Sequence, residues 1–307
     1  VITPGAKTAV FAALASVLEP GDEVLTPAIG FPSYTEIPRF LGATPAYYAL
    51  DARRGFAIDV DDLAARITPR TRALIVNAPH NPTGGTLSRA ALARLADIAI
   101  AHDLAVITDE IYADLQYNGD FTSLASLPEL AGQVVVVDGL SKNFAMTGWR
   151  LGYAIVPAAH APAFERFAIH NFSCTNTFVQ VAAVAALTGP QDAVIAARNT
   201  YADRATRVAS ALAQVPGVRC HRPRGAFYAF PDVRDLLAQS GLTTRELAAR
   251  ALDEFDVAVL PGTAFGAAGE GFLRVAFLQP SPQLEQGLDR LARCLTSVAA
   301  GASAAAR

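Results

Sequence analysis

Lysine is almost absent from this chain. Of its 25 lysine and arginine residues only Lys7 and Lys142 are lysines, which leaves 25 − 2 = 23 arginines. Arginine therefore supplies nearly all of the positive charge, and a need for charge alone does not explain a lysine at position 142. A partly desolvated lysine amine can lose its proton and attack a carbonyl to form a Schiff base, which a guanidinium cannot do. Lys142 is therefore a candidate nucleophile.

Other scarcities exclude several classes of protein. The cysteines Cys174, Cys220 and Cys294 are odd in number and form no CxxC pair, which argues against a disulfide framework or a zinc site and favours a reducing cytoplasm. The longest apolar runs, such as Val181–Leu187, are far shorter than the roughly 20 residues of a membrane-spanning helix. No secretory signal is visible, and a net charge of −3 without basic runs gives no indication of nucleic-acid binding. We expect a cytoplasmic protein with no metal, membrane or nucleic-acid partner.

The chain is long and apolar enough to form a large core. It has 307 residues, 52% of them hydrophobic, which predicts roughly two domains and argues against disorder. It begins at Val1, and its one methionine is Met146. We therefore expect it to be part of a longer protein.

The first two thirds alternate short apolar segments with helical patterns. The predicted strands are Glu23–Thr26, Thr44–Tyr48, Ala73–Val76, Ala105–Thr108, Val134–Val137 and Tyr153–Val156. Their continuous apolar character is typical of strands buried on both faces of a parallel sheet. Helices are predicted at Lys7–Leu18 and at Ser88–His102, which begins with a capping serine. The alternation predicts an α/β fold with a mostly parallel central sheet flanked by helices.

The pattern changes after a long helical segment at Gln191–Gln214. Beyond it strands and helices are mixed, which predicts a smaller α+β domain. The predicted strands are Val218–Cys220, Ala226–Phe230, Val257–Leu260 and Phe272–Ala276, and the predicted helices are Thr243–Glu254 and Pro282–Leu295. We expect a large domain over residues 1–200 and a small domain over residues 201–307, with an approximate boundary inside the long helix.

Polar side chains follow several of the predicted strands. Ligands of open α/β sheets bind beyond the carboxyl ends of the strands, so these side chains are candidates for one site. They are Asn81 in NAPHNPTGG, Asp109 and Tyr112 in DEIY, Ser141 and Lys142 in DGLSKN, and then Arg150. The segment TPGAK, with Gly5, stands at the head of the first predicted helix.

Together these groups match the chemistry of pyridoxal phosphate. A carboxylate such as Asp109 can hold a pyridinium proton, and asparagine and tyrosine can hydrogen-bond a phenolic oxygen. A helix N-terminus reached through Gly5, with Arg150 and a serine hydroxyl, can bind a phosphate. Each group alone is common in proteins without a cofactor, because an aspartate that ends a strand is more often a helix cap. Their joint occurrence in this order favours the cofactor.

The same residues resemble a known family. NAPHNPTGG, ITDEIY and GLSKNFAMTGWRLGY look like the fold-type I, class I/II aminotransferases, which are pyridoxal-phosphate enzymes that include aspartate and aromatic transaminases. The similarity continues through GAFYAFPDV (Gly225–Val233), VAVLPGTAFG (Val257–Gly266) and FLRVAF (Phe272–Phe277). The resemblance implies a ping-pong transfer of an amino group from an L-amino acid to a 2-oxo acid.

The resemblance also implies a role for each candidate residue. Lys142 is implied to form the aldimine with pyridoxal phosphate and to move the proton between the substrate Cα and the cofactor. Asp109 is implied to pair with the pyridine nitrogen, and Arg274 to bind the substrate α-carboxylate. The other implied contacts are the ring face (Phe31), the ring oxygen (Asn81 and Tyr112) and the phosphate (Arg150, Ser141 and the backbone NH groups around Gly5, Ala6 and Lys7).

The chain departs from the family pattern at three places. Gly139 stands where many members have a phosphate-binding serine or threonine, and Ala6 stands where a second glycine is common, which is harmless if φ is negative there. The family also has a sizeable segment before TPGAK that lines the substrate pocket and contributes a tyrosine to the partner subunit. By resemblance we expect a homodimer with active sites at the subunit interface.

Two alternatives use the same residues. A β-lyase or a decarboxylase would share the lysine, the ring contacts and the phosphate contacts, and differ in which substrate bond aligns with the ring. A less favoured alternative is the aminotransferase-like sensor domain of a transcriptional regulator. The amino-acid substrate stays open, because Arg274 would bind the α-carboxylate that all amino acids share. His80 is expected to orient its loop and not to act as a base.

Overall fold

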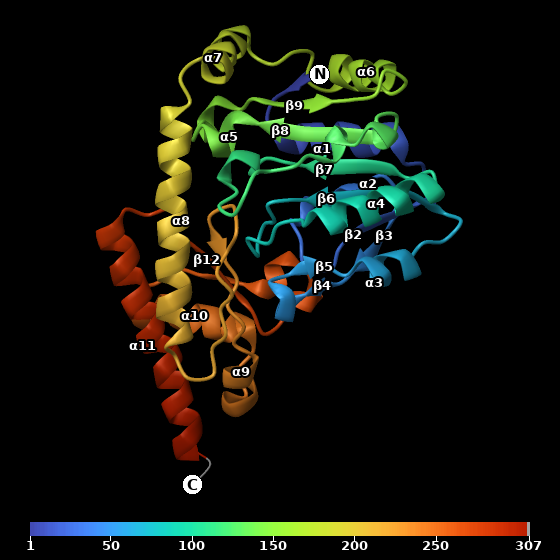
Figure 1. Cartoon of the computed structure of the whole chain (residues 1–307). Coiled ribbons are helices and arrows are strands. Elements are labelled where there is room, and N and C mark those ends of the chain that lie inside the picture. The colour runs from blue at the N-terminus through green and yellow to red at the C-terminus, as the bar shows by residue number, and fades with distance from the viewer. Residues whose placement is uncertain (306–307) are drawn as a thin grey trace.

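The computed structural model describes residues 1–305 and is built around a seven-stranded sheet (Figure 1). Its strand order is β1-β9-β8-β7-β6-β2-β3. The bounds are β1 Ile2–Thr3, β2 Glu23–Pro27, β3 Thr44–Tyr48, β6 Thr71–Asn77, β7 Ala105–Asp109, β8 Val134–Gly139 and β9 Gly152–Ile155. Strands β3, β2, β6, β7 and β8 run parallel, whereas β9 pairs antiparallel with β8, and β1 pairs antiparallel with β9.

Both faces of the central strands are buried because their side chains alternate between two hydrophobic clusters. In β8, Val135 and Val137 join the cluster under helices α1 (Ala6–Val17) and α2 (Ser33–Phe40). The alternate valines of the same strand face the opposite cluster, together with residues of α3 (Val60–Ala65) and α4 (Arg89–Ala101). Figure 1 shows α3 and α4 on the near face of the sheet and α1 and α2 behind it. This explains the continuous apolar character of the strands.

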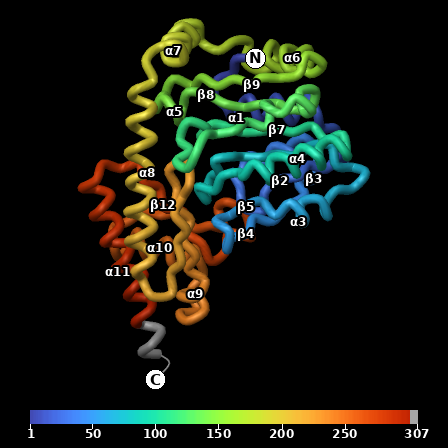
Figure 2. The backbone as a smooth tube through the Cα atoms, viewed as in Figure 1, coloured from blue at the N-terminus to red at the C-terminus, as the bar shows by residue number. Residues whose placement is uncertain are grey.

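The remaining elements before the C-terminal part connect the strands of the sheet or follow its last strand, β9. They are the hairpin β4 (Leu50–Asp51) and β5 (Ala57–Ile58) with η1 (Ala52–Arg54), the short helices η2 Ala113–Leu115, η3 Leu124–Ser126, η4 Pro128–Leu130 and η5 Thr147–Trp149, and the helices α5 Leu140–Asn143, α6 Ala161–Asn171, α7 Thr177–Thr188 and α8 Asp192–Ala213. Figure 2 shows α8 running from α7 past the edge of the sheet to the C-terminal elements.

The C-terminal part forms a second, smaller layer beside α8. It contains the antiparallel strands β10 (Tyr228–Ala229), β12 (Leu273–Ala276) and β11 (Leu260–Pro261) in that spatial order. Its helices are η6 Gly262–Phe265, η7 Ala267–Gly269, α9 Arg234–Ser240, α10 Thr244–Phe255 and α11 Ser281–Ala305. The apolar side chains of α9, α10 and α11 share one cluster with residues of α8.

The structure confirms the predicted fold class and corrects it in detail. All six strands predicted in the first two thirds are present, with ends shifted by at most two residues. The predicted strand at Val218–Cys220 is wrong, since that segment forms only an isolated bridge between Arg219 and Asp232. The segment predicted at Val257–Leu260 becomes a strand only at Leu260. The predicted boundary near residue 200 falls inside α8, and the division into two domains stays a prediction.

Within residues 1–305 no single helix is both long enough and apolar enough to cross a bilayer. Helices α7 and α8 meet the length and composition criteria only as a pair, and the pair is bent by 75°.

Candidate active site

The carboxyl ends of β6, β7 and β8 bring the predicted polar residues to one edge of the sheet. Asn77 at the end of β6 is in register with Asp109 at the end of β7. Strand β8 ends at Gly139, and α5 follows immediately with Lys142 on its single turn. Parallel pairing therefore places side chains from three distant segments at one rim, as the sheet topology predicts.

Lys142 is half-buried and has a perturbed amine. Its Nζ lies 5.8 Å from the centre of the Phe227 ring. Burial lowers the pKa of Lys142, and the positive charges of Arg274 and Arg150 lower it further, while Asp109 acts in the opposite direction. The amine is thus more readily deprotonated than an exposed lysine, which is what a nucleophile or a base for proton transfer requires.

Asp109 is buried, and its carboxylate is held by two donors. The Tyr34 hydroxyl donates to Oδ2 at 2.6 Å, and the backbone NH of Ile111 donates to Oδ1 at 3.2 Å. Burial raises the pKa of Asp109, while these two hydrogen bonds and the charge of Lys142 lower it. Tyr34, on α2, is itself buried, and the sequence analysis did not assign it to the site.

A second group of contacts joins Arg274 on β12 to the loop after β6. Arg274 Nη1 donates to Asn81 Oδ1 at 3.1 Å, and its guanidinium lies over the rings of Tyr228 (4.5 Å) and Phe265 (4.7 Å). Among the described residues, Arg274 Nε is buried without a hydrogen-bond partner. A stacked guanidinium with an unused donor can bind a carboxylate.

Tyr228, which stacks against Arg274, also contacts Tyr112. Tyr112 is buried, and its hydroxyl lies 3.1 Å from the hydroxyl of Tyr228. Burial raises the pKa of Tyr112, the hydrogen bond with Tyr228 and the charge of Asp109 raise it further, and the charge of Arg274 lowers it. Both tyrosines therefore stay neutral and can donate hydrogen bonds at neutral pH.

The N-terminus of α1 meets Arg150 and forms the candidate phosphate site. Gly5 has φ = 92° and no side chain to cap the helix, and no acidic residue occupies the first turn. A Cβ built on Gly5 would lie 2.3 Å from Arg150 Nη2, so a side chain at position 5 would displace the guanidinium. Ser141 on α5 is half-buried. Ala6 is the first residue of α1, and its φ is negative. Glycine is therefore not needed at position 6.

Close packing explains the glycine at position 139. Gly139 pairs with Gly152 across β8 and β9, and a Cβ at position 139 would lie 2.8 Å from the Cα of Gly152. A Cβ at Gly152 would in turn lie 2.3 Å from the backbone nitrogen of Ala6. A serine or threonine at position 139 would need the strand and the α1 terminus to move apart.

Phe31 and Lys7 stand beside this group. The Lys7 amine lies 5.3 Å from the centre of the Phe31 ring, and Phe31 contacts the ring of Tyr34 edge-on at 5.7 Å. Lys7 is exposed, unlike Lys142.

The buried His80 contacts Thr83 Oγ1 through Nδ1 at 2.8 Å, and burial lowers the pKa of His80 to about 3. His80 is therefore neutral and packs within its loop.

The structure adds three residues to those expected from the sequence. They are Tyr34, which donates to Asp109, Tyr228, which contacts Tyr112 and Arg274, and Asn77, whose side chain accepts from the Asn81 backbone NH at 2.9 Å and donates to the Asp109 carbonyl at 2.8 Å. Tyr228 stands inside the segment GAFYAFPDV that the sequence analysis had already singled out, and Tyr34 is three residues after the predicted ring contact Phe31. No local pattern marks their hydroxyls as part of the site, because their partners lie far away in the sequence.

Comparison with known proteins decides the family. Residues 1–291 match the family model of aminotransferase class I and II. This chain belongs to that family. It is 37% identical over 296 residues to an aspartate aminotransferase of Geobacillus stearothermophilus, covering 95% of this chain and 75% of the relative. It is 37% identical over 294 residues to an arginine–pyruvate transaminase of Pseudomonas aeruginosa, with 96% and 74% covered.

The fold of this aminotransferase agrees with that of solved relatives. An aromatic aminotransferase from Pyrococcus horikoshii superimposes with a TM-score of 0.92 at 37% identity, over 96% of this chain and 79% of that one. These matches confirm the predicted fold class and the predicted transfer of amino groups. The chain spans about three quarters of the length of these relatives.

Proposed function

We propose that this aminotransferase uses pyridoxal 5′-phosphate, with Lys142 as the catalytic lysine. The observation that carries the proposal is the set of charges around Lys142. The charges of Asp109, Arg150 and Arg274, from three distant segments, all act on the half-buried Lys142 amine. Each suits one charged group of the cofactor or substrate: Asp109 the ring nitrogen, Arg150 the phosphate and Arg274 the α-carboxylate. The family as a whole depends on this cofactor, which supports the proposal.

The residues present fit the group. The uncapped NH groups at the start of α1, with Gly5 packed against the Arg150 guanidinium, form a cradle for a dianionic phosphate. Backbone NH groups around Gly5, Ala6 and Lys7 and the Ser141 hydroxyl would complete it. Asp109 would hold the ring nitrogen, Asn81 and Tyr112 the ring oxygen, and Phe31 one ring face. When bound, the cofactor supplies an aldehyde that binds amino groups and a ring that accepts electrons.

The chain's own residues then divide the work. Lys142 Nζ takes and returns a proton, for which its lowered pKa is suited. Asp109 keeps a proton at the ring nitrogen, and its buried site strengthens that interaction. Arg274 binds and orients the substrate α-carboxylate with the donors that Asn81 does not occupy. The substrates are an L-amino acid and a 2-oxo acid, exchanged in two half-reactions.

The scarcity of lysine makes a direct test possible. The protein is mixed with pyridoxal phosphate and reduced with borohydride, and the added mass is located by digestion. Only Lys7, Lys142 and the terminal amine can carry the trapped cofactor. We expect a stoichiometric label on Lys142, because its half-buried amine has a lowered pKa, whereas Lys7 is exposed. Label confined to Lys7 and the terminus would contradict the proposal.

We propose that Tyr34 positions and tunes Asp109. Tyr34→Phe removes a hydrogen bond that favours the ionised carboxylate, so the Asp109 pKa should rise further. Because the ionised form is needed, activity should fall off at a higher pH on the acid side, with kcat reduced about tenfold at neutral pH. The measurement is the pH profile of kcat. Tyr47→Phe, which removes a hydroxyl that contacts exposed Arg39, serves as control. An unshifted acid limb would refute the role.

We propose that the chain forms a homodimer through α7. One face of this helix packs on the cluster containing Leu140 and Leu151, next to Lys142. The opposite face exposes Phe178 (66%), Val181 (67%) and Val184 (60%) to solvent. Figure 1 shows α6 and α7 at the outer edge of the molecule, beyond β9. Apolar side chains gathered on one exposed face mark an interaction surface, and its position would place the partner beside the site.

The dimer can be tested by charge. Phe178→Glu combined with Val181→Glu should convert a dimer to a monomer in light scattering, since two carboxylates would be buried without partners. Leu252→Glu on α10, which is also exposed, is the matched control and should leave the mass unchanged. A monomeric starting protein, or a dimer that survives both charges, would show that this face is not the interface.

A further inference from the structure

A cavity of about 950 Å³ lies outside the site described above and is lined mainly by arginine among its charged residues. The arginines come from three segments that are distant in the sequence. They are Arg53 and Arg54 on η1, Arg89 at the start of α4, and Arg222 and Arg224 in the loop between α8 and β10. Asp120 is the one carboxylate among the lining residues that the structure describes. The cavity is thus strongly positive in a chain whose net charge is −3.

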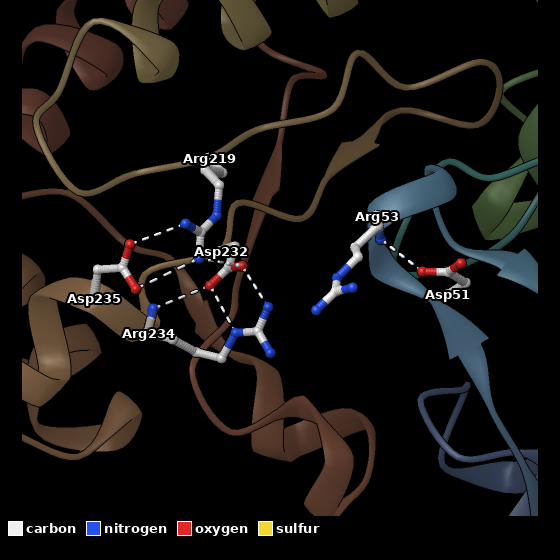
Figure 3. A network of polar contacts seen from close by, with 6 residues as sticks. All are labelled: Asp51, Arg53, Arg219, Asp232, Arg234 and Asp235. Atoms are coloured by element: carbon white, nitrogen blue, oxygen red, sulfur yellow. Dashed lines mark hydrogen bonds and ion pairs between the residues drawn. The ribbon is translucent and has the colours of Figure 1, made fainter.

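These five arginines have no counter-ion in the part of the chain that the structure describes. Within residues 1–305, no carboxylate lies within ion-pair distance of their guanidinium groups, whereas Arg94 on the same helix α4 pairs with Asp61 at 2.7 Å. Figure 3 shows the contrast, with Arg219 and Arg234 joined to Asp232 by dashed lines. The dashed line at Arg53 comes from its backbone NH to Asp51, and its guanidinium has none. Like charges gathered without partners repel one another, and a bound anion would relieve that repulsion.

The backbone around the cavity is fixed by contacts with the loop over residues 78–86. Gly84 O accepts from the backbone NH of Arg224 at 2.9 Å, and Arg224 O accepts from the NH of Tyr117 at 2.7 Å. A Cβ on Gly84 would lie 2.6 Å from the Pro223 side chain, and one on Gly85 would lie 3.1 Å from Gly55 O. The three arginine-bearing segments therefore project from a connected frame, which lowers the entropy that binding a ligand would cost.

Helix α4 adds a further positive group. It is 13 residues long and begins with Ser88 as N-cap, whose side chain accepts from the NH of Ala91. No acidic residue occupies its first turn, and both Ser88 and Arg89 line the cavity. The free NH groups of this terminus and the positive end of the helix dipole favour an anion at the same place as the arginines.

We propose that this cavity binds a polyphosphate anion. Planar guanidinium groups bind phosphate oxygens in pairs, and five of them from several walls suit a ligand with several adjacent charges better than a single phosphate. The volume lies in the range of roughly 300–1,000 Å³ that holds small molecules, so a linear triphosphate fits with or without a nucleoside. The ring of Phe121 also lines the cavity and could contact a base. The proposal does not depend on the cofactor assigned to Lys142.

Titration calorimetry on the protein saturated with pyridoxal phosphate tests the proposal. Saturation fills the phosphate site at Arg150, so that added anions report on the cavity. The titrants are tripolyphosphate, ATP, citrate and adenosine. The salt concentration is 150 mM, because interactions between exposed charges more than about 8 Å apart are then largely screened. The cavity variant is Arg222→Gln with Arg224→Gln. The control is Arg166→Gln with Arg245→Gln, which removes the same charge from two exposed arginines that lie off the cavity and have no ion pair among the described residues.

We expect one molecule of tripolyphosphate to bind per chain. The cavity variant should raise its Kd at least about thirtyfold, because each charge-assisted pair contributes roughly a factor of ten, while the control should change it less than about threefold. Equal affinity for ATP would assign the phosphate chain as the ligand, and tighter binding of ATP would assign a nucleotide. Equal losses in the two variants, equal affinity for citrate, binding of adenosine alone, or no binding at millimolar tripolyphosphate would overturn the proposal.

Discussion

Lys142→Arg should retain less than about one ten-thousandth of the wild-type rate of transamination, whereas Lys7→Arg should stay within about threefold of it. Arginine keeps the positive charge at position 142 but not the amine, and a guanidinium that stays protonated can neither attack a carbonyl nor accept a proton. The assay follows formation of the 2-oxo acid from an amino-acid donor. Because the chain has only these two lysines, the pair forms a complete comparison.

The missing function can be separated from a general defect. Lys142→Ala should regain part of its rate when methylamine is added, since a free amine can then move the proton. Lys142→Arg and Lys142→Ala should both unfold at temperatures close to that of the wild type, because Lys142 is half-buried and has no hydrogen-bond partner among the described residues. Activity in Lys142→Arg, or equal loss in Lys7→Arg, would show that the lysine has been assigned wrongly.

Asp109→Asn should lower kcat about a thousandfold and at the same time stabilise the fold. The rate falls because a neutral amide no longer holds a proton at the ring nitrogen, and losing one buried electrostatic contact costs roughly 10²–10³ in rate. The amide keeps the shape of the carboxylate: its oxygen can still accept from the NH of Ile111, and its NH2 group can donate to the Tyr34 hydroxyl oxygen. Rates and thermal unfolding are to be measured on the same preparations.

The stability effect has a definite sign and pH range. Burial raises the pKa of Asp109 above its unfolded value, so the folded state favours the protonated carboxyl. That stabilisation is complete below the unfolded pKa and is lost as pH rises through the folded pKa, where ionisation inside the protein becomes unfavourable. Asparagine does not titrate, so the advantage of Asp109→Asn in unfolding temperature should grow as pH rises from about 4.

Glu110 provides the control for this result. It is the next residue in the chain, is buried, and has a pKa that burial also raises, but its carboxylate faces Ser123 and Thr108. Glu110→Gln should alter stability with pH in the same direction and leave kcat unchanged. If both variants lose activity equally, the loss at Asp109 reflects packing and not its charge at the cofactor. If Asp109→Asn keeps its activity, the assignment of Asp109 fails.

Elements whose burial is complete were predictable from local sequence. Strands β6, β7 and β8 are apolar on both faces because helices cover both, so each stands out as a short continuous run. The capped helix α4 was equally visible. Helices α6 and α7 were not predicted. They lie at the edge of the sheet with apolar residues such as Ile169 and Phe178 exposed, and α7 has almost no polar residues to mark a solvent face.

The sequence by itself determined which groups are proposed to carry the chemistry. Lys142, Asp109, Asn81 and Arg150 follow strand ends, and the topology of parallel strands brings such positions together whatever lies between them. The family match then followed from the same segments. These features survive as local patterns because a strand, its turn and the following helix are all encoded by neighbouring residues.

Only the tertiary structure decided which partners hold those groups. The Tyr34 hydroxyl reaches Asp109 across 75 residues, and Arg274 reaches Asn81 across 193. The arginine-lined cavity likewise exists only where η1, α4 and the loop before β10 meet. Neither a hydroxyl nor a guanidinium carries a local sign of its distant partner, because its rotamer and burial are set by packing between segments. Local sequence therefore identified the candidate groups, and packing decided their orientation, the direction of their pKa shifts and the shape of the arginine-lined cavity.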